Sequence, residues 1–300
     1  MDKIAIVSHD AGGAELVSSW VANSGFHSFM YCLSGPAKKI FSANLGWNDI
    51  STIDDIVDQC DSLICGTSWQ SDLEHIAIKA FKSCGKKTVA ILDHWINYKE
   101  RFSFNGIHAL PDEIWVTDEY ALRIAKECFD NILIRSIENS YLINIKKQVR
   151  SIHSGKDIPC TALYVCEPIR EHAFKRHGDA FYWGYTEEDA LEYFLANIEV
   201  IPQDIKKILI RPHPSELPDK YNWIINRSSQ DIEFSQARTL AEDIATASVV
   251  VGCESMAMVA ALYSEKVVIS SIPPEGRKCV LPHTDIISLK NLVKKSRTVE

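Results

Sequence analysis

No apolar run in this sequence reaches the length of about 18 residues that indicates a transmembrane helix. A signal peptide is also lacking, because Met1-Asp2-Lys3 leads directly into the strand-like Ile4-Ala5-Ile6-Val7. No hydrophobic region followed by a small-residue cleavage site precedes that strand. We therefore expect a cytoplasmic protein without a transmembrane segment, for which only peripheral membrane association is open.

Cysteine pairs with the spacing of metal or redox sites are absent. The nine cysteines include no CxxC pair, their number is odd, and the sequence has no HExxH motif. We therefore expect reduced thiols, no structural metal and no cofactor. Four cysteines in or beside apolar runs are expected to be buried: Cys32, Cys65, Cys166 and Cys253. His172 and His177 lie in a polar stretch and are expected at the surface.

Positive charge is not in excess, since the formal net charge is −8. A nucleic-acid-binding domain usually has a basic balance, so this class of partner is disfavoured. A small anionic ligand is still compatible, because a few well-placed donors can hold a phosphate. The apolar fraction of 46% and the charged fraction of 24% are ordinary for a globular protein.

Short apolar runs alternate with amphipathic stretches along the whole chain. Continuous apolarity is typical of parallel strands that are covered on both faces, so the order indicates βαβ units. The expected strands are 3–8, 29–32, 62–65, 88–92, 113–116, 162–166, 207–210, 232–234, 249–251 and 267–269. The expected helices are 14–22, 73–81, 119–128, 186–198, 240–247 and 256–263. Thr186 is expected to cap its helix.

The polar segment Asn144–Pro159 is the best candidate for a linker between two domains. A chain of 300 residues suits two domains of roughly 150 residues each. We predict an α/β protein with two Rossmann-like domains, 1–155 for an acceptor and 156–300 for a nucleotide-sugar donor. This is the GT-B plan, with a ligand cleft between the domains, and open α/β sheets bind ligands beyond the carboxyl ends of their strands.

The loop Arg211-Pro212-His213-Pro214-Ser215-Glu216 begins where an apolar strand should end. Both prolines lack an N–H for strand pairing, and their fixed φ angles stiffen the loop around the histidine. An imidazole held at the carboxyl end of a strand can donate to a phosphate. The alternative is a structural histidine in a Pro-rich turn.

A second anion-binding element follows the strand at 249–251. There Gly252-Cys253-Glu254-Ser255 leads from the strand into the helix at 256–263. Unpaired N–H groups and the helix dipole favour an anion at such a helix start, and the Ser255 hydroxyl adds a donor. The alternative is a serine that only caps the helix.

With these two elements the chain resembles bacterial GT-B glycosyltransferases that carry an HP motif and a downstream Ser motif. They include sialyltransferases, polysialyltransferases and transferases of other nonulosonic acids and Kdo. The resemblance spans residues 160–275, and it implies that His213, Pro214 and Ser255 bind the phosphate of a CMP-sugar donor. Tyr164–Pro168 and Gly184–Glu187 also match the start of that domain. A second serine common beside the first is absent here, where Glu254 and Met256 flank Ser255.

Further donor contacts are expected in the same half of the chain. Glu233 and Glu254 are candidates to bind the ribose hydroxyls, with a solvated or capping carboxylate as the alternative for each. Arg211 is expected to support the loop or the carboxylate of the sugar.

The base that deprotonates the acceptor is expected from the N-terminal half. Asp10 follows the first strand, and Gly12 and Gly13 allow a tight turn and close approach of the acceptor. The pattern is not a GxGxxG fingerprint, and no NAD is expected. The alternative for Asp10 is an N-cap of the helix that follows.

Asp93 and His94 follow the strand at 88–92 and form a second candidate for the base and its orienting partner. Beside them, Trp95, Tyr98 and Arg101 are expected to stack on a sugar and bind its carboxylate. The alternative is aromatic packing beneath a loop. We favour Asp10 slightly, because its glycine-rich turn leaves room for the substrate.

These features predict a metal-independent, inverting glycosyltransferase. It would move a nonulosonic acid of the sialic, legionaminic, pseudaminic or Kdo type from a CMP-sugar to a cell-surface glycan or a lipid-linked precursor. Three alternatives remain on the same fold: a CDP-glycerol-type phosphotransferase, a UDP-sugar 2-epimerase, and a non-catalytic nucleotide-binding protein.

Overall fold

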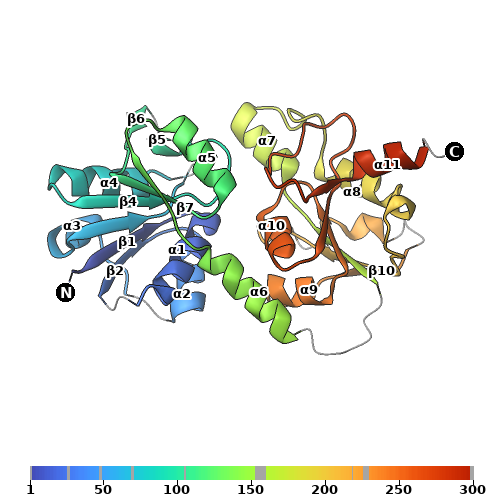
Figure 1. Ribbon diagram of the computed structural model, residues 1–300, viewed down its shortest axis with the longest axis horizontal. Coiled ribbons are helices and arrows are strands. Elements are labelled where there is room, and N and C mark those ends of the chain that lie inside the picture. Colours follow the sequence, from blue (N-terminus) through green and yellow to red (C-terminus); the bar gives the residue numbers. More distant parts are fainter. Residues whose placement is uncertain are drawn as a thin grey trace. The chain divides into compact units, whose positions relative to one another are not determined.

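The computed structural model describes residues 2–25, 28–46, 49–68, 71–104, 106–152, 160–217, 219–225 and 230–297. The chain divides into an N-terminal unit, Met1–Tyr141, and a C-terminal unit, Leu142–Glu300. Figure 1 shows that each unit has its own sheet with helices around it. Both main sheets are six-stranded and parallel, which confirms the predicted α/β class with two Rossmann-like domains.

The N-terminal sheet has the strand order β2-β1-β3-β4-β7-β8. Its strands are β1 (Ile4–Ser8), β2 (Phe29–Leu33), β3 (Ser62–Cys65), β4 (Lys87–Ile91), β7 (Glu113–Val116) and β8 (Leu133–Ser136). The helices are α1 (Ala11–Asn23), α2 (Ala37–Leu45), α3 (Ile53–Gln59), α4 (Leu73–Ser83) and α5 (Glu119–Cys128). A 3₁₀ turn, η1 (Glu100–Phe102), precedes the small antiparallel pair β5 (Ser103–Phe104) and β6 (Ile107–His108).

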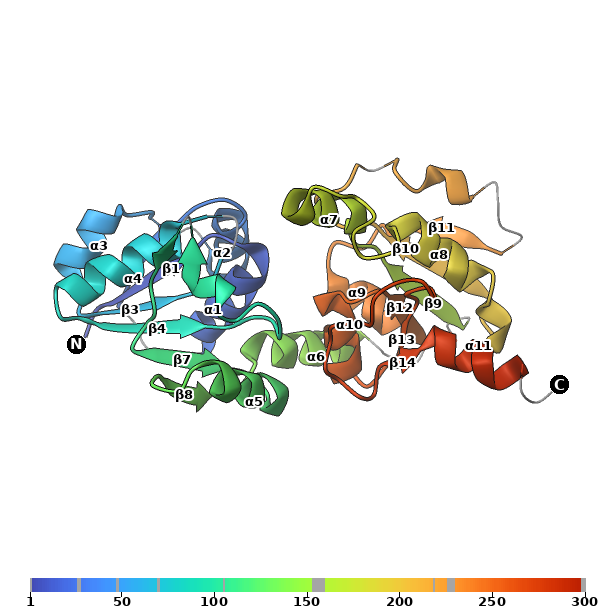
Figure 2. The same cartoon turned by 90° about the horizontal axis from the view of Figure 1, so that it is seen from above.

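Every residue of β1 is buried, so helices must cover both faces of its sheet. Ile4 and Ile6 pack in one core with Val17 of α1 and Phe41 of α2. The helix α4 contacts β1, β3 and β4 and contributes none of its residues to that core. The helices α3 and α4 lie side by side in Figure 2 and are in contact.

The C-terminal sheet has the strand order β11-β10-β9-β12-β13-β14. Its strands are β9 (Thr161–Val165), β10 (Lys207–Arg211), β11 (Ile232–Phe234), β12 (Val249–Gly252), β13 (Val267–Ser270) and β14 (Ile287–Ser288). The helices are α7 (Ile169–His177), α8 (Glu187–Leu195), α9 (Leu240–Thr246), α10 (Met256–Tyr263) and α11 (Leu289–Arg297), with 3₁₀ turns η2 (Ile198–Val200) and η3 (Asn222–Ile224).

The core of the C-terminal unit is built on β9, all of whose residues are buried. Tyr164 packs with Phe194 of α8 and Val293 of α11 in one cluster. The helices α9 and α10 contact β9, β12 and β13 but add no residue to that cluster. Helices therefore cover both faces of this sheet as well, which leaves its two ends for a ligand.

The helix start at Thr186 is confirmed. Its side chain accepts from the Asp189 N–H at 3.1 Å, and the Asp189 carboxylate accepts from the Thr186 N–H at 2.8 Å. This reciprocal capping box satisfies two N–H groups that the first turn leaves unpaired.

The chain between the units differs from the predicted linker. The helix α6 (Ser140–Ile152) occupies much of Asn144–Pro159, while 153–159 lies outside the described residues. The units divide between Tyr141 and Leu142, upstream of the predicted boundary at 155/156. The helix has a buried stripe, since Leu142, Ile145 and Val149 are spaced by three and four residues.

The described cysteines carry no disulfide, and Cys32, Cys65, Cys166 and Cys253 are buried as predicted. His172 and His177 are exposed, which also agrees with the prediction.

Candidate functional site

Two groups of polar side chains lie at the carboxyl ends of the parallel strands, one in each unit. In the C-terminal unit, His213 follows β10 and Ser255 follows β12. Both strands pair with β9, so the two residues sit at one edge of the sheet, two strand spacings or about 10 Å apart. In the N-terminal unit, Asp10 follows β1 and Asp93 follows β4.

The loop after β10 is fixed by the carboxylate of Glu216. This side chain is completely buried, and it accepts the backbone N–H of His213 at 3.0 Å. It also accepts from the Tyr221 hydroxyl and from the Lys220 ammonium, each at 2.7 Å. Lys220 forms a further ion pair with the buried Glu187. The loop is therefore held by charged hydrogen bonds in addition to its prolines.

The ring of His213 is oriented by its own loop. Its Nδ1 lies 3.2 Å from the backbone N of Ser215 and 2.7 Å from the Ser215 hydroxyl. A backbone N–H can only donate, so Nδ1 accepts and the neutral ring carries its proton on Nε2. Burial lowers the pKa of His213, which favours this neutral form. The Nε2–H is thus a donor suited to a phosphate oxygen.

Ser255 is the N-cap of α10, so the capping alternative is confirmed. Its Oγ accepts from the Ala257 N–H at 3.1 Å. A serine hydroxyl keeps its own proton for donation while its oxygen accepts. Capping therefore leaves Ser255 able to donate to an anion.

The start of α10 also holds a carboxylate that the sequence did not single out. Oε1 of Glu167 accepts from the backbone N–H groups of Cys253 at 3.1 Å and Glu254 at 2.8 Å. Burial, together with the charge of Glu254, raises the pKa of Glu167 to about 8. These two N–H groups are engaged within the chain, so Ser255 is the donor left to a ligand here. The signal was the position of Glu167 directly after β9.

Three predicted donor residues have partners within the chain. Arg211 donates to the buried Asp243 at 2.6 Å, so it supports the loop rather than standing ready for a sugar carboxylate. Glu254 is buried and forms an ion pair with Arg277. Glu233 is 56% exposed and pairs with Lys207 at 2.7 Å, as the solvated alternative describes.

Asp10 sits at the N-cap position of α1 but makes no capping hydrogen bond through its side chain. Its Oδ1 lies 2.7 Å from Nδ1 of His9 and accepts from the Ser68 hydroxyl at 2.8 Å. The sequence analysis missed both partners. A carboxylate that binds Nδ1–H leaves Nε2 of a neutral histidine as a proton acceptor. The His9–Asp10 pair is thus arranged for general base chemistry.

A buried carboxyl group holds the turn that carries this pair. Glu74 is 2% exposed and accepts the backbone N–H of His9 at 2.8 Å. Burial raises the pKa of Glu74 to about 7. Glu74 lies on α4, and the sequence gave it no distinguishing signal.

Asp93 lies close to the same turn. An added Cβ on Gly12 would lie 2.2 Å from Asp93 Oδ2, so only glycine leaves room for this carboxylate. Asp93 accepts from Arg101 Nη1 at 2.6 Å, and the same nitrogen donates to Thr67 at 2.8 Å. The predicted turn with Gly12 and the predicted Asp93 loop therefore come together at one edge of the sheet.

Trp95 and Tyr98 do not form the expected sugar-stacking wall. They are 5% and 2% exposed, as the packing alternative describes. The Trp95 indole donates to Asp118 at 2.8 Å, which satisfies its N–H inside the unit. Nδ1 of His94 accepts from the backbone N–H of Trp95 at 2.9 Å. His94 therefore orients the local chain, and no contact to Asp93 is observed among the described residues.

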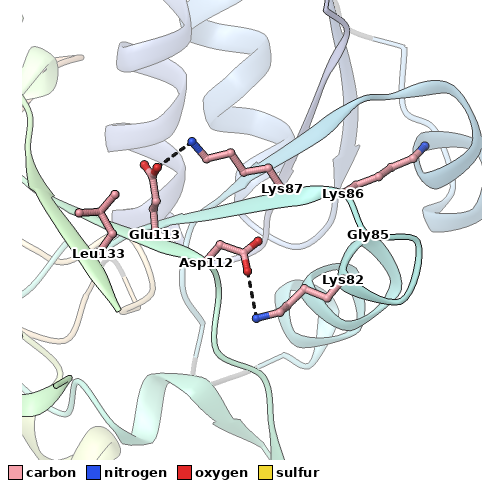
Figure 3. A pocket seen from close by; sticks show the side chains of 7 residues that line it. All are labelled: Lys82, Gly85, Lys86, Lys87, Asp112, Glu113 and Leu133. Atoms are coloured by element: carbon pink, nitrogen blue, oxygen red, sulfur yellow. Dashed lines mark ion pairs between the residues drawn. The ribbon is translucent and has the colours of Figure 1, made fainter. Parts of the chain in front are cut away.

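A pocket of about 460 Å³ lies at the amino ends of β4, β7 and β8, far along the strands from these residues (Figure 3). Two of its lysines are paired, Lys82 with Asp112 at 3.2 Å and Lys87 with Glu113 at 2.7 Å. The third, Lys86, turns away to the carbonyl of Cys60 at 2.7 Å. Its cations are thus partnered within the chain, and we assign no ligand to it.

Among the described residues, no group of three or more His, Cys, Asp or Glu side chains is arranged to hold a metal ion. In the same part of the chain, every helix is too short or too polar to cross a bilayer.

No protein-family model and no curated protein sequence matches this chain. Solved structures do match over nearly its whole length. The UDP-GlcNAc 2-epimerase of Methanocaldococcus jannaschii has a TM-score of 0.65 at 12% identity, covering 98% of this chain and 92% of that one. A Listeria monocytogenes protein assigned as a UDP-N-acetylglucosamine 2-epimerase has a TM-score of 0.59 at 12% identity, with coverages of 99% and 88%.

The glycotransferase of kitacinnamycin has a TM-score of 0.50 at 12% identity, covering 93% of this chain and 82% of that one. At such identities the likeness concerns the fold alone, and the chain has the GT-B fold. The resemblance of its HP and Ser motifs to CMP-sugar transferases stays a prediction.

Proposed function

We propose that this protein is a glycosyltransferase that takes a nonulosonic acid from a CMP-sugar and attaches it to a glycan or lipid-linked acceptor. The observation that carries the proposal is the pair of donors at one edge of the C-terminal sheet, His213 Nε2–H and the Ser255 hydroxyl. Both belong to the motifs that resemble those of CMP-sugar transferases. Neither donor is consumed by the contacts that position it.

The donor end needs charge neutralisation more than acid catalysis. CMP leaves as a phosphate monoester anion, so donors aimed at its phosphate stabilise the leaving group as charge develops. His213 can fill this role from its rigid loop, and Ser255 from the cap of α10. Pro214 stiffens the loop next to His213.

The acceptor end is proposed in the N-terminal unit. Its general base is the His9–Asp10 pair, in which Nε2 of His9 takes the proton of the acceptor hydroxyl and Asp10 orients the ring. Direct proton uptake by Asp10 is the competing assignment. Arg101, paired with Asp93, is a candidate to contact an anionic acceptor or donor sugar.

A UDP-sugar 2-epimerase is the second candidate. The observation in its favour is the fold likeness to the two proteins described as UDP-N-acetylglucosamine 2-epimerases. An epimerase on this chain would use the same donors for the diphosphate of UDP. The two candidates differ in nucleotide and in reaction.

The test is a nucleotide panel followed by turnover. Thermal unfolding of the full chain is measured with CMP, CDP and UDP at equal concentrations, because a ligand that binds only the folded state raises the melting temperature. Preferential stabilisation by CMP, with CMP released from a CMP-nonulosonate when an acceptor glycan is added, supports the transferase. Preferential stabilisation by UDP, with conversion of UDP-GlcNAc at C2, rejects it in favour of the epimerase.

A further inference from the structure

Arg277 lies in the loop after β13 and is stacked on an aromatic ring. Its guanidinium carbon is 4.0 Å from the centroid of the Trp183 ring, and its backbone N–H donates to the Trp183 carbonyl at 3.0 Å. A guanidinium on the face of an indole is attracted by the ring quadrupole. This side chain is therefore placed by packing as well as by charge.

The edge of the same guanidinium is held by Glu254. Nη2 of Arg277 is bonded to Oε1 of Glu254, whose side chain is 9% exposed. Arg277 itself is 28% exposed, and its Nε is buried with no hydrogen-bond partner among the described residues. A guanidinium has five N–H donors, so this contact leaves donors of Arg277 for another acceptor.

Two glycines fix the loops that carry this arrangement. An added Cβ on Gly184, whose φ is +80°, would lie 2.6 Å from the carbonyl oxygen of Glu275. An added Cβ on Gly276 would lie 2.7 Å from Cδ1 of Tyr185. The loops before and after Arg277 therefore close on each other with no space for a side chain, and the cation is held in one place.

The charges around the start of α10 call for a cation when an anion binds. Glu254 and Glu167 are both buried there, and Glu254 directly precedes Ser255. Arg277 is the cation that pairs with Glu254, so it lies beside the Ser255 cap. A phosphate at Ser255 without a nearby cation would face carboxylates only.

We propose that Arg277 binds the phosphate of the nucleotide donor beside Ser255, while Trp183 and Glu254 hold its guanidinium in place. This assignment rests on the proposed donor site. It adds a residue that lies outside the HP and Ser motifs. An arginine suits the role, because its planar fork can donate to a phosphate oxygen while it keeps the carboxylate and the stacked ring.

The experiment measures binding of CMP and cytidine, and of UDP and uridine, to the full chain by titration calorimetry. We compare the wild type with Arg277→Gln, Arg277→Lys and, as a matched control, Lys278→Gln, which removes an exposed positive charge from the next position of the same loop. Thermal unfolding of each variant establishes that it is folded. Arg277→Lys serves if Arg277→Gln does not fold.

We expect Arg277→Gln to weaken the phosphorylated nucleotide by about tenfold or more, as for loss of a hydrogen bond between charged groups, and to leave the nucleoside unchanged. Arg277→Lys keeps the charge but loses the fork and the stack, so it should weaken nucleotide binding less. Lys278→Gln should have no effect. The nucleotide-to-nucleoside affinity ratio is therefore the quantity that reports Arg277.

An unchanged ratio in Arg277→Gln, an equal loss for nucleotide and nucleoside, or no binding of either nucleotide to the wild type overturns the assignment. Failure of the proposed function looks different. If UDP binds in preference to CMP, the CMP-sugar proposal fails, yet the UDP-to-uridine ratio still tests Arg277.

Discussion

Nδ1 of His9 lies 2.7 Å from Oδ1 of Asp10, and that carboxylate also accepts the Ser68 hydroxyl. The contact joins two neighbouring residues at the end of β1, so a single turn carries both the proton acceptor and the group that orients it. Glu74 holds the backbone of this turn from below through the His9 N–H.

The two members of this pair should respond differently to substitution. His9→Gln removes the acceptor Nε2, and we expect turnover to fall by about 10²- to 10⁴-fold, the usual contribution of a positioned base. Asp10→Asn should keep a fraction of activity and move the pH–rate profile, because it alters the ring's orientation and basicity. Rates across pH 5–9 check this. Loss of activity in Asp10→Asn with an active His9→Gln would assign the base to Asp10.

Gly12 and Gly13 form a matched pair of glycines in the first turn of α1. A Cβ at Gly12 meets Asp93 Oδ2 at 2.2 Å, whereas the nearest atom to a Cβ at Gly13 is 3.5 Å away. Gly12→Ala should therefore displace Asp93 and lower stability by about 1–3 kcal/mol, and Gly13→Ala should be tolerated. Chemical denaturation of both variants gives the comparison. Equal stabilities would mean that Asp93 moves aside at no cost.

His213→Ala should abolish transfer and leave the fold intact. Loss of one preorganised donor at a developing anion typically lowers turnover by about 10²- to 10³-fold. His172→Ala, which removes an exposed histidine of α7, is the control and should behave as wild type. Turnover rates and melting temperatures of both variants check the prediction, and near-normal turnover of His213→Ala would reject the donor assignment.

Glu167 should make the protein less stable as pH rises. Its carboxyl group ionises near its ordinary value of 4.5 when unfolded but near 8 when folded. Between these values the folded state binds more protons, so the free energy of unfolding falls with increasing pH. Each pKa unit corresponds to about 1.4 kcal/mol, so the effect reaches a few kcal/mol.

Denaturation of Glu167→Gln from pH 5 to pH 9 measures this contribution. The variant should be more stable than wild type at pH 9, and its stability should depend less on pH. Glu233→Gln, at an exposed carboxylate, should follow the wild-type curve. A Glu167→Gln curve parallel to that of wild type would show that this carboxyl group does not titrate differently on folding.

Strand positions were predictable because they are continuous apolar runs, and those at 62–65, 113–116 and 232–234 agree with the structure to the residue. Helices of mixed character were harder. The helix α7 has charged and aromatic residues on most of its surface and buries only Ile169 and Ala173. The helix α6 was read as a linker, because Lys and Arg residues interrupt a stripe of only three buried side chains.

The site was predictable where it depends on strand ends. Asp10, Asp93, His213 and Ser255 follow strands that were recognised, so their edge of the sheet could be inferred. Their partners could not, because those contacts are tertiary. Ser68 is 58 residues from Asp10, and the Glu167 carboxylate bonds an N–H 87 residues away. The burial of Trp95 and Tyr98 likewise depends on packing that periodicity does not reveal.

The most direct test of the donor site is a structure of the protein with bound CMP. The account predicts that the CMP phosphate lies within hydrogen-bond distance of His213 Nε2 and Ser255 Oγ, at the carboxyl ends of β10 and β12. A phosphate bound elsewhere, or one whose contacts exclude both His213 and Ser255, would contradict it.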